Sequence, residues 1–269
     1  MRSTVLDIPV DILSRSDSLG KIEQWLLDKP NSPKMVVTAY SEFFVLATKD
    51  VEFAKILKRA DLVTPDGVSV LAAVDYSRKA RGGVCQKIVE GFRVGGKILS
   101  GKMGETVTGV WLFEELTKKA AERGWKVFLL GGWDEVSART VQMLLKRFPG
   151  LRVVYDAGEK LVGTDKETNF RVIKKINAFK PDILFVAYNP VKQEKWIAAH
   201  LPQLKVGVAM GVGGTFNEYL GEFKKAPAWM ERSGLKWLWR VIVEPRRFGR
   251  IIRAVFVFPW LVFKGSLKK

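Results

Sequence analysis

The sequence has little cysteine and little histidine, with one residue of each among 269. Cys85 alone cannot form an internal disulfide, and Cys85 with His200 offers too few thiolate and imidazole ligands for a zinc site. We therefore expect no zinc site. A reducing compartment, the cytoplasm, suits this cysteine content.

Long apolar runs are also absent. The longest, residues 254–263, is about half of the ~20 residues that a membrane-spanning helix needs, and Pro259 interrupts it. The first residues contain no apolar stretch of the kind found in secretory signals. The C-terminal run is therefore predicted to lie on a bilayer and not to cross one.

Acidic residues are scarce beside basic ones: 28 Asp and Glu against 45 Lys and Arg, a net charge of +17. Residues 224–269 hold twelve basic residues, two acidic ones and four tryptophans, and so carry +10 of that charge. Phosphates pair with ammonium and guanidinium groups, and indoles favour the headgroup region of a bilayer. This segment is therefore suited to bind an anionic phosphate and a membrane surface. A nucleic-acid-binding protein is the alternative, although no zinc finger, RNP-type strand or isolated recognition helix is visible.

Short β-rich runs alternate with longer segments of helical periodicity. Strands are predicted at residues 35–39, 61–64, 126–130, 151–155, 182–187 and 205–209, and helices at 112–123, 135–147, 167–179 and 193–200. Buried parallel strands are continuous apolar runs of this kind. The alternation predicts an α/β fold: a Rossmann-like, mostly parallel sheet with helices on both faces, which binds ligands at the carboxyl ends of its strands.

Two segments depart from this alternation. Residues 75–102 hold seven basic residues and six glycines, which is typical either of a mobile basic insertion or of a glycine-broken helix that folds over the site. Residues 235–253 are predicted as a helix with arginines on one face. We therefore expect an α/β domain at residues 1–232, with the insertion at about 75–102, and a helical, basic, membrane-associating appendage at residues 233–269.

Polar residues and glycines follow several predicted strands. Asp66 precedes Gly67 at the mouth of the sheet, where a carboxylate can act as a general base or cap the next helix. Gly131 and Gly132 allow a nucleotide to approach the backbone, or form an ordinary tight turn. Asn217, in a second glycine-rich turn, can contact a base or sugar, or cap a helix.

Another helix start lies after the strand that ends near residue 187. Lys192 or Gln193 there is expected to point over the same mouth, although a run of Lys, Gln and Glu is also typical of a solvated helix face. No Asp-x-Asp motif occurs in the sequence, so the carboxylate pair that usually holds Mg²⁺ or Mn²⁺ on a diphosphate is missing. Cationic side chains would then have to stabilise a diphosphate leaving group.

Taken in order, these motifs resemble the WecG/TagA/CpsF family of bacterial glycosyltransferases over nearly the whole chain. The blocks are Val36-Val-Thr-Ala-Tyr-Ser-Glu-Phe, Ala60-Asp-Leu-Val-Thr-Pro-Asp-Gly, Val107-Thr-Gly, Leu129-Leu-Gly-Gly, Lys192-Gln-Glu-Lys-Trp-Ile, Gly211-Val-Gly-Gly-Thr-Phe, Lys225-Ala-Pro-Ala-Trp-Met and Gly234-Leu-Lys-Trp-Leu-Trp-Arg to Glu244-Pro-Arg-Arg. The resemblance implies a metal-independent, inverting enzyme with no bound metal and no cofactor, since the UDP-sugar is its donor substrate. It would move an N-acetylmannosamine-type sugar from a UDP-sugar to a polyprenyl-diphosphate-linked amino sugar, in cell-surface polysaccharide or teichoic acid synthesis.

The resemblance also implies roles for single residues. Asp66 matches the family's base, and the arginines of the appendage match groups that close on the site and neutralise the diphosphate. The expected substrate-binding residues are Thr38, Tyr40, Thr106, Gly131, Gly132, Gln193, Gly213, Asn217, Lys225, Arg240, Arg247 and Arg250. The expected partners are the UDP-sugar, the lipid-linked acceptor and the anionic inner face of the cell membrane, with self-association near the site and no nucleic acid.

Four positions depart from the family's pattern. Tyr40, Thr106, Trp111 and Asn217 stand where the family usually has Asn, Arg, an acid and Asp. The Arg missing at Thr106 removes one phosphate contact, which basic residues of the insertion would replace. It also leaves a second interpretation open, a nucleotide-sugar or lipid-binding module that has kept the fold and lost catalysis.

Overall fold

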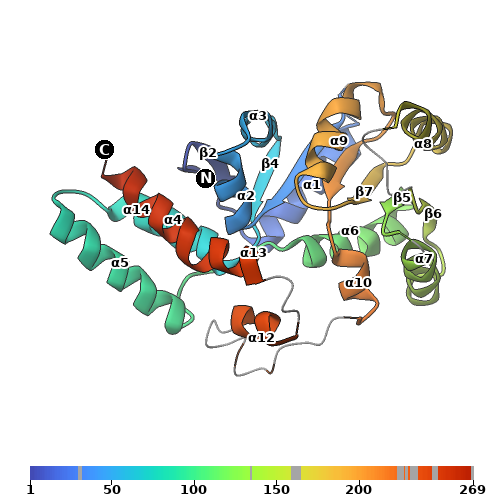
Figure 1. Ribbon diagram of the computed structural model, residues 1–269. Coiled ribbons are helices and arrows are strands. Elements are labelled where there is room, and N and C mark those ends of the chain that lie inside the picture. The colour runs from blue at the N-terminus through green and yellow to red at the C-terminus, as the bar shows by residue number, and fades with distance from the viewer. Residues whose placement is uncertain are drawn as a thin grey trace.

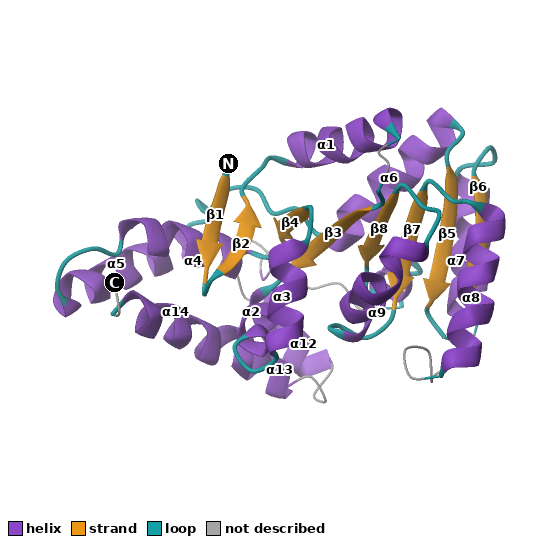
Figure 2. Ribbon diagram, turned by 90° about the horizontal axis from the view of Figure 1, so that it is seen from above, coloured by secondary structure: helices purple, strands orange, loops and turns teal. Residues whose placement is uncertain are grey.

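A computed structural model describes residues 1–29, 32–133, 135–158, 165–222, 227, 230, 236–243 and 248–267. Within these ranges, the side chains of Lys236, Trp237, Arg240, Val241 and Arg250 lie outside the description. Six strands form one parallel sheet in the order β4-β3-β8-β7-β5-β6 (Figures 1 and 2). They are β3 (Lys34–Ala39), β4 (Leu62–Pro65), β5 (Lys126–Gly131), β6 (Arg152–Asp156), β7 (Ile183–Ala187) and β8 (Val208–Gly211). All six predicted strands are present, although β8 begins three residues later than predicted.

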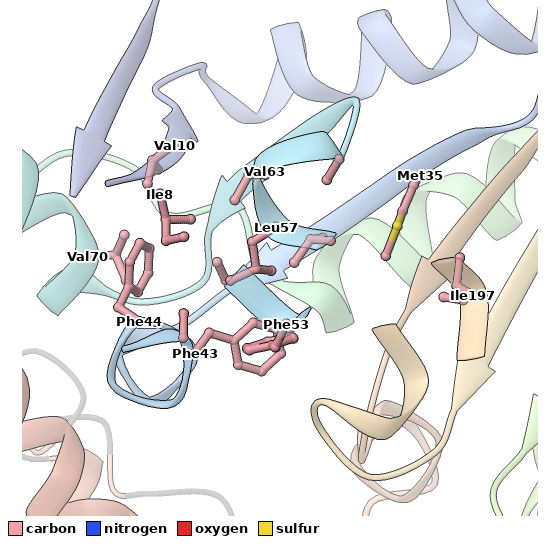
Figure 3. Close-up of a cluster of buried hydrophobic side chains, with 14 of the residues drawn as sticks. Ile8, Val10, Met35, Phe43, Phe44, Phe53, Leu57, Val63, Val70 and Ile197 are labelled. Atoms are coloured by element: carbon pink, nitrogen blue, oxygen red, sulfur yellow. The ribbon is translucent and has the colours of Figure 1, made fainter. Parts of the chain in front are cut away.

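Helices cover both faces of the sheet, as predicted. The helices on one face are α1 (Arg15–Asp28), α6 (Gly109–Arg123), α7 (Val136–Arg147) and the short α10 (Thr215–Tyr219). Those on the other are α2 (Ser41–Ala47), α3 (Val51–Arg59), α8 (Lys166–Phe179) and α9 (Lys192–His200). Each face of the sheet packs against its helices in one apolar cluster. Successive strand residues point to opposite faces, so Phe185 packs in the first cluster, under α1, α6, α7 and α10, and Leu184 in the second, under α2, α3, α8 and α9. Figure 3 shows part of the second cluster, where Phe43, Phe44 and Phe53 gather below β3.

An antiparallel hairpin of β1 (Arg2–Val5) and β2 (Ile8–Asp11) precedes the sheet and was not predicted from the sequence. Its two turn residues, Leu6 and Asp7, have φ values of 47° and 62°, which a two-residue hairpin turn requires and which normally select Gly, Asn or Asp. Leu6 therefore hides the turn from a sequence pattern. The hairpin is fixed to β4 because Asp11 Oδ2 accepts the Val63 N–H at 2.9 Å.

The basic insertion is helical in the structure. It forms the end of α4 (Val68–Lys79) and the whole of α5 (Val84–Leu99), with glycines inside the second helix. Arg93 and Lys97 of α5 reach Asp75 of α4 at 3.0 and 2.8 Å, and they hold the two helices together. Burial opposes the ionisation of Asp75, but Lys79 and Lys97 still lower its pKa to about 2.

Most of the described part of residues 233–269 is helical. It contains α12 (Lys236–Val243), α13 (Phe248–Ile252), the π-helical turn η3 (Arg253–Val257) and α14 (Phe258–Ser266), so the predicted helix over residues 235–253 is present as two pieces, with 235 and 244–247 outside the description. α14 is built into the core, since Phe258 is 1% exposed and its ring lies 5.5 Å from that of Phe44. The domain boundary at residue 233 stays a prediction. No described helix has the length and apolar character needed to span a membrane.

Candidate active site

A pocket of about 610 Å³ lies at the carboxyl ends of β3, β4, β5, β7 and β8, and its volume is within the range typical of small-molecule sites. In Figure 2 the strands of the sheet all point toward this edge. The lining residues are Thr38, Tyr40, Phe43, Asp66, Thr108, Val110, Gly132, Trp133, Val136, Ala187, Tyr188, Asn189, Pro190, Gln193, Gly211, Val212, Gly213, Gly214, Thr215, Asn217 and Glu218. The predicted location of the ligand site therefore coincides with the pocket.

Asp66 lies on the pocket wall directly after β4. The N-cap of α4 is Gly67, with φ of 138°, so Asp66 does not cap the helix that follows it, and that alternative is wrong. Instead, Asp66 Oδ2 accepts the N–H of Gly109, the first residue of α6, at 3.2 Å. The positive end of the α6 dipole therefore faces the carboxylate and stabilises its negative charge.

Gly109 brings three polar side chains together. A Cβ at this position would lie 3.0 Å from Thr38 Oγ1, 3.7 Å from Thr215 Oγ1 and 3.8 Å from Asp66 Oδ2. Residue 107 is held beside β4, because its N–H donates to the Pro65 carbonyl at 3.1 Å and its carbonyl accepts the Thr64 hydroxyl at 3.1 Å. The Val107-Thr-Gly block thus positions the start of α6 against Asp66, Thr38 and Thr215.

Gln193 is 3% exposed, and its amide is engaged at both ends. Its Oε1 accepts the Gly213 N–H at 2.8 Å, and its Nε2 donates to Glu194 Oε1 at 2.6 Å. The other carboxylate oxygen of Glu194 accepts the N–H of Val191 at 2.7 Å, and Val191 has φ of 72°, which is rare for a β-branched residue. Gln193 therefore shapes the glycine-rich loop after β8, in addition to lining the pocket, and is not on a solvated face.

Burial raises the pKa of Glu194 to about 7, because its side chain is enclosed in the protein. The folded state then binds this proton more tightly than the unfolded state, so stability is greatest below about pH 4.5 and falls as the pH rises toward 7.

Relative to Glu194→Gln, the wild type should lose on the order of 3 kcal/mol of unfolding free energy between pH 4.5 and pH 8. Chemical denaturation across this range measures the difference. A constant difference would contradict the prediction, and Glu122→Gln, whose carboxylate is 48% exposed, is the control.

Gly211 is required by the same network. A Cβ there would lie 2.6 Å from both Gln193 Nε2 and Glu194 Oε1, so Gly211→Ala has to displace both groups and should destabilise the fold by about 1–3 kcal/mol. Gly20→Ala is the matched control: this site in α1 is open, with nothing within 4 Å, and alanine should stabilise it by about 0.5–1 kcal/mol. Thermal unfolding measures both changes, and equal shifts would contradict the steric argument.

The glycine turn after β5 serves packing as well as the pocket. Gly131 and Gly132 have φ of 91° and 73°, and a Cβ on Gly132 would lie 2.7 Å from the Phe216 ring. A Cβ on Gly131 would meet the Ala187 carbonyl at 2.7 Å. Gly132 lines the pocket and Gly131 does not. The tight-turn interpretation thus explains Gly131, and Gly132 fits both interpretations.

Tyr40 connects the pocket to the C-terminal segment. Its hydroxyl donates to Glu42 Oε2 at 3.3 Å, and the other oxygen of Glu42 accepts Arg253 Nη2 at 2.7 Å and Nε at 3.1 Å. Arg253 begins the π-helical turn η3, and the Glu42 side chain is only 5% exposed. An ion pair across 211 residues of sequence therefore fixes the C-terminal segment beside the pocket wall.

The structure brings most of the predicted site residues together. Asp66, Thr38, Tyr40, Gly132, Gln193, Gly213 and Asn217 all line the pocket. Asn217 lies inside α10 and donates to Glu222 at 2.6 Å, so the helix-cap alternative is wrong. Thr106 does not line the pocket, and its carbonyl accepts the Arg15 Nε–H at 2.9 Å.

The structure does not describe the side chains of the predicted cationic site residues. Lys225 and Arg247 lie outside the described residues, and Arg240 and Arg250 lie on α12 and α13 with side chains outside the description. The basic residues offered as substitutes for the missing Arg are Arg78, Lys79, Arg81 and Arg93, none of which lines the pocket in the described part of the chain. Lys79 and Arg93 pair with Asp75 instead.

Sequence reasoning missed several pocket residues. Trp133 and Tyr188 stack with ring centroids 6.2 Å apart, and neither Trp133 Nε1 nor Tyr188 Oη has a hydrogen-bond partner among the described residues. Burial raises the pKa of Tyr188, which therefore stays a neutral donor. Thr108 and Thr215 were also missed. Thr215 begins α10 after β8, which was an available signal, whereas Thr108 caps α6, a helix that follows α5 and not a strand. Across the described residues, no three His, Cys, Asp or Glu side chains converge as metal ligands, and metal independence stays a prediction.

Comparisons with known proteins agree with this geometry. Residues 3–88 and 89–269 match the glycosyl transferase WecG/TagA/CpsF family. Two relatives from Staphylococcus aureus, strains MRSA252 and NCTC 8325 / PS 47, are each 26% identical over 264 residues, which is 98% of this chain and 93% of theirs. Both are named N-acetylglucosaminyldiphosphoundecaprenol N-acetyl-beta-D-mannosaminyltransferase.

Proposed function

Because this chain belongs to the WecG/TagA/CpsF family and is therefore a glycosyltransferase, we propose that it transfers an N-acetylmannosamine-type sugar from UDP to a polyprenyl-diphosphate-linked amino sugar. The relatives' name supports the sugar and the lipid-linked acceptor. The observation that carries the proposal is the position of Asp66, whose carboxylate lies on the wall of a pocket at the strand ends with Thr38 and Thr215 beside it. The product would enter cell-surface polysaccharide or teichoic acid synthesis.

The proposed reaction is a single displacement with inversion. Asp66 takes the proton of the acceptor hydroxyl, and the hydroxyl oxygen forms a bond to the anomeric carbon of the donor sugar. The bond from that carbon to the β-phosphate oxygen breaks on the opposite face, and UDP leaves with the electron pair. A base at this position accelerates such steps by about 10²- to 10⁴-fold.

UDP leaves as an anion and needs stabilisation in the transition state. The proposed donors are Arg240, Arg247 and Arg250 of the C-terminal segment, which would act without a metal ion. The Arg253–Glu42 ion pair supports this, because it holds the segment that carries these arginines next to Tyr40 of the pocket. The Thr38 hydroxyl and the loop held by Gln193 are the proposed contacts for the donor.

The acceptor's lipid anchor requires access to a membrane surface, and we propose peripheral attachment to the inner face of the cell membrane. Ile252, Phe256 and Trp260 follow each other at intervals of four residues along the C-terminal helices, and Phe256 and Trp260 are 65% and 60% exposed. Such an apolar stripe among basic residues suits the headgroup boundary.

A screen of UDP-sugars with a polyprenyl-diphosphate-linked N-acetylglucosamine acceptor tests the proposed function. We expect UDP release only when donor and acceptor are both present, and a product heavier by one N-acetylhexosamine in the mass spectrum. UDP binding without release would support the lapsed binding module instead. Steeply salt-dependent binding to DNA or RNA, with indifference to UDP, would support the nucleic-acid alternative.

A further inference from the structure

The net positive charge of the chain is concentrated in two segments that are far apart in sequence. Residues 75–102 hold seven basic and two acidic residues, a net +5, and residues 224–269 carry +10, so together they carry +15 of the total of +17. The rest of the molecule is nearly neutral. Each of the two segments therefore attracts anionic surfaces, and the rest of the chain does not.

Exposed apolar side chains are concentrated in the same two segments. Twelve of the nineteen exposed large hydrophobic side chains among the described residues belong to them, five of these on α5. The five on α5 are Val84, Ile88, Val89, Phe92 and Leu99, with exposures of 54%, 44%, 66%, 79% and 70%. Monomeric soluble proteins rarely concentrate apolar surface in this way.

α5 has three distinct faces. Lys87 and Val94 are buried on the inner face, and Lys87 Nζ donates to the carbonyl of Ser266 in α14 at 2.7 Å. Arg93 and Lys97 lie on a second face, where they pair with Asp75. Ile88, Phe92 and Leu99, at spacings of four and seven residues, share the third face, which no other described helix covers.

The two segments meet in space. Tyr76 of α4 contacts Ser266 of α14 through their hydroxyls at 3.2 Å, and Ser266 also accepts from Lys87 of α5. Figures 1 and 2 both show α4, α5 and α14 grouped at one end of the molecule, away from β5 and β6. The apolar side chains of α5 and those of the C-terminal helices are thus presented by one packed unit.

We propose that α5 is a second membrane contact, whose Ile88, Phe92 and Leu99 insert into the headgroup region of an anionic bilayer together with the C-terminal helices. The proposal rests on the proposed function, and it extends membrane attachment from the C-terminal segment to α5. Exposed Arg78, Arg81 and Lys102 lie around this helix and pair with lipid phosphates, whereas a second copy of the chain would bring like charges together.

Sedimentation with vesicles of phosphatidylglycerol and phosphatidylethanolamine tests the proposal on the full chain. The double variant Ile88→Ser/Phe92→Ser should lower the bound-to-free ratio by at least about tenfold. Phe170→Ser is the matched control, because Phe170 is 69% exposed on α8 at the other end of the molecule; it should bind as the wild type does. Vesicles of phosphatidylcholine alone should bind all three proteins weakly.

Two further measurements separate the alternatives. Transfer to a short-chain, water-soluble acceptor should be the same in the double variant and the wild type, which shows that the variant is folded. Unchanged vesicle binding of the double variant would overturn the proposal. Light scattering measures self-association of both proteins, and the proposal also fails if the double variant binds vesicles more weakly only because it no longer self-associates. If the wild type transfers no sugar at all, the proposed function fails, while vesicle binding still decides the role of α5.

Discussion

Replacing Asp66 with Asn should lower the rate of sugar transfer by at least about 100-fold, because Asn cannot accept the proton of the attacking hydroxyl. The amide oxygen of Asn can still accept the Gly109 N–H, which donates to Asp66 at 3.2 Å in the wild type. The fold and the affinity for UDP should therefore be retained. Initial rates of UDP release, UDP titration calorimetry and the unfolding temperature measure the three quantities.

Asp61→Asn is the matched control for this experiment. Asp61 precedes β4, at the opposite end of the strand from Asp66, and its Oδ2 likewise accepts a backbone N–H, that of Met35 at 2.9 Å. The same chemical change there should leave the transfer rate within a few-fold of the wild type. If Asp66→Asn retains near-normal turnover, Asp66 is not the base.

Replacing Arg253 with Met should destabilise the protein by about 3 kcal/mol, because it removes two guanidinium donors from a carboxylate that is 5% exposed. This is the lower end of the range for buried pairs, since Arg253 itself is 38% exposed. The reverse change, Glu42→Gln, should cost less, because the guanidinium can turn to water. Chemical denaturation measures both free energies.

The double variant Glu42→Gln/Arg253→Met provides the internal check. It removes the buried charge together with its partner, so its stability should return to within about 1 kcal/mol of the wild type. Arg139→Met is the matched control for a surface pair: Arg139 and Glu222 are 52% and 30% exposed, and this change should cost less than about 1 kcal/mol. Equal costs for Arg253→Met and Arg139→Met would refute the proposed anchor.

Most strands of the sheet could be predicted because they are apolar runs buried on both faces, whereas the edge strand β6 is only partly buried. β7 shows this best, since all five of its residues are buried. The position of the site followed from the same pattern, because parallel strands end at one edge and Asp66, Gly132 and Gly213 each follow a strand. Short sequence patterns therefore predict which backbone segments form the site.

Contacts between distant segments could not be predicted in this way. Nothing near Glu42 indicates that its partner is Arg253, and the basic residues of α5 gave no sign that they would pair with Asp75 instead of facing the pocket. The N–H of Gly109 on Asp66 joins two elements 43 residues apart. Such pairings depend on tertiary packing, which short sequence patterns do not encode.

The position of α14 has a consequence for biosynthesis. Phe258 and Val262 of α14 complete the apolar cluster over α2, and Phe258 comes 214 residues after Phe44 of that cluster. Until the ribosome has made α14, this cluster therefore lacks both side chains, and Phe44 has no Phe258 ring beside it. The nascent protein should depend on chaperones until α14 has been made, and a chain truncated before Phe258 would be aggregation-prone because the apolar cluster stays open.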